Sequence, residues 1–263
     1  MFGKPVVKKI TQNKELGSEL TSLTNSSKST EKTERKIDIT DEFSRSFKLP
    51  SLGKFNDLDD GYLSVAPLTI GQVCDIANLY KIKTDSDRLQ TLCTILNRSI
   101  LNVKSEDLTL GDFDALCLHL AEISCGEPYS LEMEFKGIRL KQSIPLDDFS
   151  IIHLNTSLLQ DGCDYPRVRD RIYFQHLLEQ KIELSDIESS LFYYCSGNSG
   201  EEKLDCFRTR KLEFLKDLIK YQKEISFGIS EEIEITNPEG KREIIKVPFD
   251  FFQYFRFYLT QIM

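Results

Sequence analysis

The sequence lacks several patterns that would indicate a membrane protein, a zinc protein or a nucleotide-binding enzyme. It has no run of about 18 or more apolar residues, so we expect no membrane span. No two cysteines have the C-x-x-C spacing of a zinc ribbon or a thioredoxin-type site. Neither phosphate-binding pattern, G-x-x-x-x-G-K-[ST] or G-x-G-x-x-G, is present. The sequence therefore contains no familiar motif for binding a metal or a nucleotide.

Acidic residues outnumber basic residues, 42 to 34. The formal net charge is −8, which disfavours a general binder of nucleic acid or anionic membranes, because such binders need basic surface. The seven cysteines are odd in number, spread along the chain and preceded by no secretory signal, so we expect free thiols in a reducing cytoplasm. With 263 residues, 40% of them hydrophobic, the chain can build one large domain or two small ones.

The first 46 residues differ in composition from the rest. The stretch ELGSELTSLTNSSKSTEKTERK is rich in Ser, Thr, Lys and Glu, and it offers too little apolar area to offset its chain entropy. We therefore predict a flexible N-terminal arm over residues 1–46, with order beginning near LPSLGKF at 49–55. The arm is either an inert tail or a tether that becomes ordered on a partner through Phe2, Val6, Val7 and Ile10.

Three amphipathic helices are expected after the arm. The first begins at about Thr69, and the second begins at TDSDRLQ with Asp85 or Ser86 as its cap. The third begins at Thr109, where Asp112 three residues later makes a capping-box-like start. Apolar residues keep helical spacing in each: Val73, Ile76, Leu79 and Tyr80; Leu89, Leu92, Cys93, Leu96 and Ile100; and Leu110, Phe113, Leu116, Cys117, Leu120 and Ile123.

Two similar strings, EISCG at 122–126 and EISFG at 224–228, indicate an internal repeat. Each is followed by alternating residues typical of a β-hairpin, SLEMEFKGIRLKQSI in one case and EEIEITNPEGKREIIKV in the other. The first hairpin is followed by PLDDF and the second by PFDFF. Gly126 and Gly228 are each expected to end the preceding helix in a left-handed conformation. The pattern predicts two helix–hairpin units.

The predicted fold class is α+β, mostly helical, with two repeated helix–β-hairpin units and a disordered N-terminal arm. The expected parts are the arm at 1–46, a helical region with the first unit at 47–154, a helical insert at 155–203, and a second unit with an aromatic C-terminal helix at 204–263. Within the insert, GNSGEEK at 197–203 is expected to be a loop. The residues expected to face inward are Val168, Ile172, Leu177 and Leu178 in the insert, and Leu212, Leu215, Leu218, Ile219 and Ile225 in the second unit's helix.

Single residues that suggest a site have simpler interpretations. Cys117 and His119 are two apart on a helix, so they point in different directions. The acidic stretch DLDDG at 57–61 resembles part of a calcium loop but lacks the later bidentate Glu. The remaining histidines, His153 and His176, lie far away in sequence, and Arg167, Arg169 and Arg171 alternate around a helix as a solvated face does. We predict no catalytic, cofactor-binding or metal-binding residue.

The run PFDFFQYFRFYLTQIM at 248–263 is unusually aromatic. Phe251, Tyr254, Phe255 and Tyr258 share one helical face, while Phe252, Phe257 and Leu259 lie on others. A helix that is apolar on several faces must be buried by something. We expect it to close the core against the second hairpin, or else to place its excess aromatic surface in a partner's groove.

Three groups of residues together resemble a family of T4-like bacteriophage tail proteins, the baseplate hub subunits and hub assembly proteins of contractile-tailed phages. They are LPSLGKF leading through GYLSVAPLTIGQV; GDFDALCLHLAEISCGEPYSLEMEF followed by PLDDF; and EISFG with PFDFFQYF. The resemblance covers most of the chain from residue 49 onward. It implies zinc-ribbon cysteines in the hairpins of many members. Here Glu132, Glu134 and NPEG stand in the hairpins instead, so we expect no metal.

The resemblance implies binding between proteins and no enzymatic activity. We expect a chaperone-like assembly factor of the baseplate hub that binds other hub proteins in the host cytoplasm, without a cofactor, nucleic acid or small-molecule substrate. One alternative is a permanent structural subunit of the baseplate in the virion. Another, of a different class, is a cysteine-dependent enzyme that uses Cys93, Cys117 or Cys125.

Overall fold

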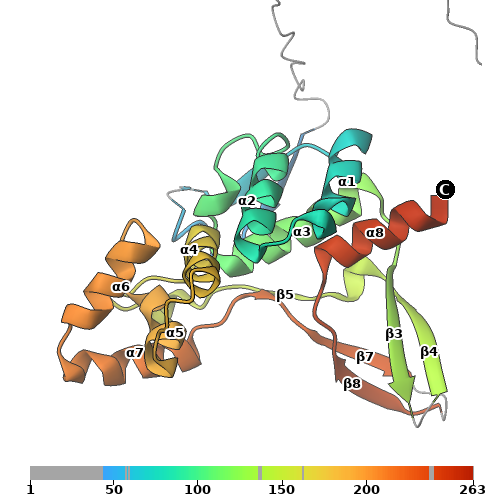
Figure 1. Ribbon diagram of the computed structural model, residues 1–263. Helices are drawn as coiled ribbons and strands as arrows, with labels where there is room; N and C mark the ends of the chain where they lie inside the picture. The colour runs from blue at the N-terminus through green and yellow to red at the C-terminus, as the bar shows by residue number, and fades with distance from the viewer. Residues whose placement is uncertain are drawn as a thin grey trace, which may run out of the picture. The chain divides into compact units, whose positions relative to one another are not determined.

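The computed structural model describes residues 44–56, 58, 60–135, 138–161, 163–236 and 240–262 (Figure 1). Side chains at 133–135, 138–140 and 260–262 are not described. The chain divides into two units, Met1–Asp38 and Ile39–Met263, and every element below belongs to the second. The predicted arm lies outside the described residues except at 44–46. Arg45 and Ser46 already belong to a β-strand, so regular structure begins before the expected position 49.

The described residues form eight α-helices and four two-stranded antiparallel sheets, which confirms the α+β class. The helices are α1 (Ile70–Ala77), α2 (Asp85–Leu96), α3 (Leu110–Ser124), α4 (Val168–Glu179), α5 (Asp186–Leu191), α6 (Gly200–Thr209), α7 (Leu212–Glu224) and α8 (Phe251–Ile262). The paired strands are β1 (Arg45–Lys48) with β2 (Tyr62–Val65), β3 (Tyr129–Phe135) with β4 (Ile138–Ile144), β5 (Ile151–Ile152) with β6 (Gly228–Ile229), and β7 (Glu232–Thr236) with β8 (Arg242–Lys246).

The N-termini of α1 and α3 are built alike. Each begins after a threonine, Thr69 or Thr109, whose hydroxyl accepts a hydrogen bond from the N–H three residues on, and each has a glycine at its second position. Gln72 completes a capping box in α1. Asp112 does not play this part in α3. Its buried carboxylate accepts a bond of 2.8 Å from the Thr109 hydroxyl, and two more of 2.8 Å from the Ser51 N–H and from Asn56 Nδ2. Asp112 therefore acts at the start of its own helix, as expected, and also holds the loop after β1.

The predicted helices α1, α2 and α3 are confirmed, with small corrections. The cap of α2 is Thr84, rather than Asp85 or Ser86. Most residues of the predicted stripes are buried in the main core, but Tyr80 is 58% exposed because the chain leaves α1 at Ala77 and continues in a short 3-10 turn. The same core takes in β2, the first residue of β3 and the second hairpin through Ile233, Ile235 and Val247.

The two similar strings fold differently. In EISCG, α3 continues to Ser124 and Gly126 takes a left-handed φ of +69°, as predicted. In EISFG, α7 stops at Glu224 and the chain runs extended into β6. Gly228 therefore does not end a helix. It pairs with Ile152 of β5, and a Cβ at this position would lie 2.9 Å from the Cα of Gly111. Both hairpins exist, but the helix-to-hairpin connection is not repeated.

The helical insert has one more helix than expected. α6 begins at Gly200, inside the stretch GNSGEEK that was predicted to be a loop, because Ser199 caps it and Glu201 and Glu202 favour its first turn. Lys203 of α6 is fully buried, and its Nζ lies 2.7 Å from Asp170 of α4. Two residues expected to face inward are exposed: Leu178 on α4 and Leu212, at the start of α7.

Helix α8 packs mainly on α1, with further contacts to α3 and β3 (Figure 1). We expected it to close the core against the second hairpin, so the surface it covers was predicted wrongly. Its inner face was predicted correctly: Phe251, Tyr254 and Phe255 are buried, and Tyr258 is half-buried. Arg256 stacks over the exposed Tyr80 ring, 5.2 Å from its centroid, which ties α8 to the end of α1.

Candidate functional site

A cleft of about 540 Å³ opens between elements that are distant in sequence. Its walls come from α2, α3, α4, β6 and the residues at the start of α8. We call it the α3 cleft, because α3 contributes a face of four residues along its length. The lining residues are Asp85, Arg88, Leu89, Leu92, Leu110, Phe113, Asp114, Cys117, Val168, Arg171, Gln175, Ile229, Glu231, Pro248, Phe249, Asp250, Phe251 and Phe252.

The inner part of the α3 cleft is apolar. Leu92, Phe113, Val168 and Phe251 are buried in the protein core, and half-buried apolar residues such as Phe252 surround them. These side chains are there because the apolar stripes of α2 and α3 and the first turn of α8 converge on one side of the core. The cleft therefore offers an apolar surface to any group that enters it.

The rim of the cleft carries more negative than positive charge. Four acidic residues line it, Asp85, Asp114, Glu231 and Asp250, against Arg88 and Arg171. Arg88 is already engaged, because its guanidinium lies 2.7 Å from Asp85 and also donates to the carbonyl of Ile82. The rim is suited to a basic group by its charge.

Asp114 is the most perturbed group at this rim. Its side chain reaches solvent at the cleft mouth but is closely surrounded by protein, and the loss of hydration raises its pKa from 3.8 to about 6. Arg171 opposes the rise in pKa, and Glu231 adds to it. The carboxylate is therefore charged at neutral pH, in a position where it gains from a positively charged neighbour.

The α3 cleft is poorly equipped for cysteine chemistry. Cys117, one helical turn after Asp114, is buried. Its burial raises its pKa well above 9.0, and the negative charge of Asp114 adds a smaller contribution in the same direction. A thiolate is the nucleophilic form, so burial holds this thiol mostly in its less reactive, protonated form at neutral pH. Burial also raises the pKa values of the other two thiols of the enzyme alternative, Cys93 and Cys125, to about 11. No histidine is among the residues that line the cleft.

A second hollow, of about 360 Å³, brings together two histidines that the sequence keeps apart. His119 of α3 and His153 after β5 both line it, with Glu122 and Asp147. The His119 ring lies 4.6 Å from that of Phe47, and its Nδ1 is 3.4 Å from Glu122. Burial lowers the His119 pKa, although Glu122 opposes this. Cys117 and His119 thus face different hollows, as their spacing predicts.

The other candidate residues have structural partners. His176 contacts Gln180 on its own helix, with 2.7 Å between the two Nε2 atoms. Arg169 pairs with Asp107 at 2.9 Å, and Arg167 lies 3.8 Å from Asp164. Asp57 and Asp59 of DLDDG lie outside the described residues. Within the described ranges, no three His, Cys, Asp or Glu side chains are arranged to hold a metal ion, and no helix is long and apolar enough to cross a membrane.

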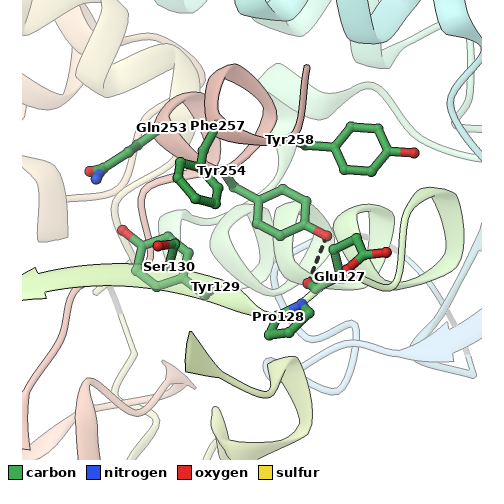
Figure 2. A pocket seen from close by; sticks show the side chains of 8 residues that line it. All are labelled: Glu127, Pro128, Tyr129, Ser130, Gln253, Tyr254, Phe257 and Tyr258. Atoms are coloured by element: carbon green, nitrogen blue, oxygen red, sulfur yellow. Dashed lines mark hydrogen bonds between the residues drawn. The ribbon is translucent and has the colours of Figure 1, made fainter. Parts of the chain in front are cut away.

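The aromatic helix predicted to be a contact surface is largely committed to the fold. Figure 2 shows the small pocket between α8 and the start of β3, where the Tyr254 hydroxyl donates to the carbonyl of Glu127 at 2.9 Å. This pocket encloses about 10 Å³, room for roughly one water molecule. Phe251 and Phe252, at the start of α8, line the α3 cleft instead.

Sequence reasoning did not identify Asp114, Glu231 or Asp250. One signal was present for Asp114, a charged residue between Phe113 and Cys117 in a strongly apolar helix. Arg171 is exposed, as its assignment to a solvated face predicts, but its place at the cleft mouth was not anticipated. Comparisons with protein-family models, curated proteins and solved structures give no significant match. The resemblance to phage baseplate proteins therefore stays a prediction.

Proposed function

We propose that the chain is a non-enzymatic assembly factor of a phage baseplate hub, which binds other tail proteins in the host cytoplasm through the α3 cleft. The single observation that carries the binding role is the cleft itself, an apolar interior with an acidic rim and a volume suited to a few side chains. The assignment to a baseplate hub rests on the sequence resemblance alone.

The occupant that fits is a peptide segment of a partner protein with apolar side chains and one basic residue. Apolar groups of the segment would cover Phe113 and Phe252, and the basic group would lie near Asp114 and Glu231. Burying apolar surface supplies affinity, while the charge pairing fixes orientation and discriminates between partners. An acidic segment is disfavoured, because it would meet the negative rim.

The binding role is tested with overlapping peptides that span the tail hub proteins of a phage encoding this chain. We expect tight binding by peptides that combine apolar residues with Lys or Arg. Glu231→Lys reverses the charge of an exposed rim residue and should weaken that binding. Glu183→Lys makes the same change on an exposed loop away from the cleft, and it should bind as the unaltered chain does. Equal binding by both variants would exclude the cleft.

The assembly role is tested separately, by quantitative mass spectrometry of purified phage particles and of the lysate that produced them. An assembly factor should be abundant in the lysate and missing from the particles. A constant ratio to hub proteins inside the particles would instead identify a structural subunit of the virion. Either result leaves the peptide-binding measurement unaffected, so the two parts of the proposal can fail independently.

A further inference from the structure

Two cysteines of the helical insert face each other across backbone strands. Cys163 and Cys195 form an isolated antiparallel bridge. The Asp164 N–H donates to the Tyr194 carbonyl at 2.8 Å, so the bond flanks the two cysteines and does not join them. In such a non-hydrogen-bonded pair the Cα atoms lie about 4.5 Å apart and the side chains share one face. That separation falls within the roughly 4.4–6.8 Å that a disulfide spans.

A third thiol completes the cluster. Cys195 is fully buried, and Cys163 and Cys206 are both half-buried against the same group of apolar residues. Cys206 raises the pKa of both Cys195 and Arg210, so its sulfur lies close to both groups. Burial raises the pKa of the Cys163 thiol, and it raises that of Cys195 to about 12. These two thiols are therefore protonated at rest, and Cys206 links the buried Cys195 to the surface.

We propose that Cys163, Cys195 and Cys206 form a thiol–disulfide site, which a small-molecule disulfide oxidises to a Cys163–Cys195 bond. Cys206 attacks the small disulfide, forms a mixed disulfide and releases one small thiol. Cys195 then loses its proton and, as the thiolate, attacks the Cys206 sulfur in a slow step that releases the second small thiol. Cys163 finally attacks Cys195, which returns Cys206 to its thiol. Two protein thiols lose two electrons and two protons, and one small disulfide becomes two thiols.

The remaining pair of neighbouring cysteines provides an internal control. Cys93 of α2 and Cys117 of α3 are both buried, and Cys93 is close enough to influence Cys117 electrostatically. Neither is half-exposed, so a small disulfide has no direct access to them in the folded protein. A link between Cys93 and Cys117 would report unfolding of the main core.

The test is incubation of the folded full-length chain with oxidised glutathione, followed by proteolysis without reduction and mass spectrometry. We expect the peptide linked through Cys163 and Cys195, with loss of that link after treatment with dithiothreitol. Cys206→Ser should slow formation of the link. Cys74→Ser, which alters a half-buried thiol on α1, should leave its rate unchanged.

Three results would overturn the proposal. One is glutathione attached to separate cysteines with no internal link. Another is a Cys93–Cys117 link that appears at the same rate, which would mean that oxidation requires unfolding. The third is an unchanged rate in Cys206→Ser, which would remove the relay role. Cys163→Ser alters a half-buried residue, so it tests the end product even if Cys195→Ser does not fold.

Discussion

Replacing Lys203 by methionine should strongly destabilise the folded chain. The Lys203 side chain has no solvent exposure, and its Nζ lies 2.7 Å from Asp170 and 3.0 Å from Asp164. It also donates to the carbonyl of Tyr193 at 3.1 Å. Asp170 is equally buried, and among the described residues its Oδ1 has no hydrogen-bond partner. Methionine keeps most of the lysine's apolar stem, so the main effect is a stranded carboxylate.

Removing one partner of a buried ion pair costs about 3–5 kcal/mol. We expect Lys203→Met to lose that much free energy of unfolding, which is a large share of the roughly 5–15 kcal/mol typical of a folded domain. The chain contains no tryptophan, so urea unfolding is followed by far-ultraviolet circular dichroism. Lys216→Met, on the exposed face of α7, is the matched control and should change stability by less than about 0.5 kcal/mol.

A double variant separates the charge from the shape of the site. Asn at position 170 can still accept the hydrogen bond that the Arg167 N–H gives to Asp170 at 3.0 Å, but it carries no charge to strand. Lys203→Met combined with Asp170→Asn should therefore be more stable than Lys203→Met alone. The reasoning fails if Lys203→Met costs less than about 1 kcal/mol, or if the two losses simply add.

Three further predictions follow from local geometry. Gly111→Ala should cost about 1–3 kcal/mol, because its Cβ would lie 2.5 Å from the Phe227 carbonyl oxygen; Gly71→Ala, at the matching position of α1, meets only Thr69 Oγ1 at 3.9 Å and should gain up to about 1 kcal/mol in urea unfolding. The raised Asp114 pKa means that stability falls as pH rises from 3.8 towards about 6, and Asp114→Asn should remove this part of the measured pH dependence. Tyr254→Phe removes the hydrogen bond to Glu127 and should lower the free energy of unfolding by about 1 kcal/mol, with an unchanged far-ultraviolet spectrum; no measurable loss would mean that water satisfies the carbonyl equally well.

Rules that involve only residues close in sequence correctly predicted where α1 and α3 begin and how α3 ends. Thr69 and Thr109 cap helices because a hydroxyl satisfies an N–H within the same turn, and Gly126 ends α3 for a reason equally local. EISFG shows where this stops. Its glycine is taken into β6 by pairing with β5, a partner more than seventy residues away, so the same letters as in EISCG lead to another structure.

The α3 cleft could not be predicted for the same reason. Asp114 comes from α3, Arg171 from α4 and Glu231 from the link between β6 and β7, and only the folded chain brings them to one rim. On its own helix, Arg171 is indistinguishable from Arg169, which serves an ion pair with Asp107. Sequence patterns identify which face of a helix is apolar, but they do not say which other elements will meet it.

The position of α8 also bears on how the protein is made. The Tyr254 hydroxyl bonds to the Glu127 carbonyl, a partner 127 residues earlier in the chain. During translation, α1 and α3 leave the ribosome long before α8 can cover them, so their apolar surfaces face water in the nascent chain. Exposed apolar surface of this kind promotes aggregation and recruits chaperones. The speed at which the last aromatic residues are synthesised would then influence how much soluble protein the cell obtains.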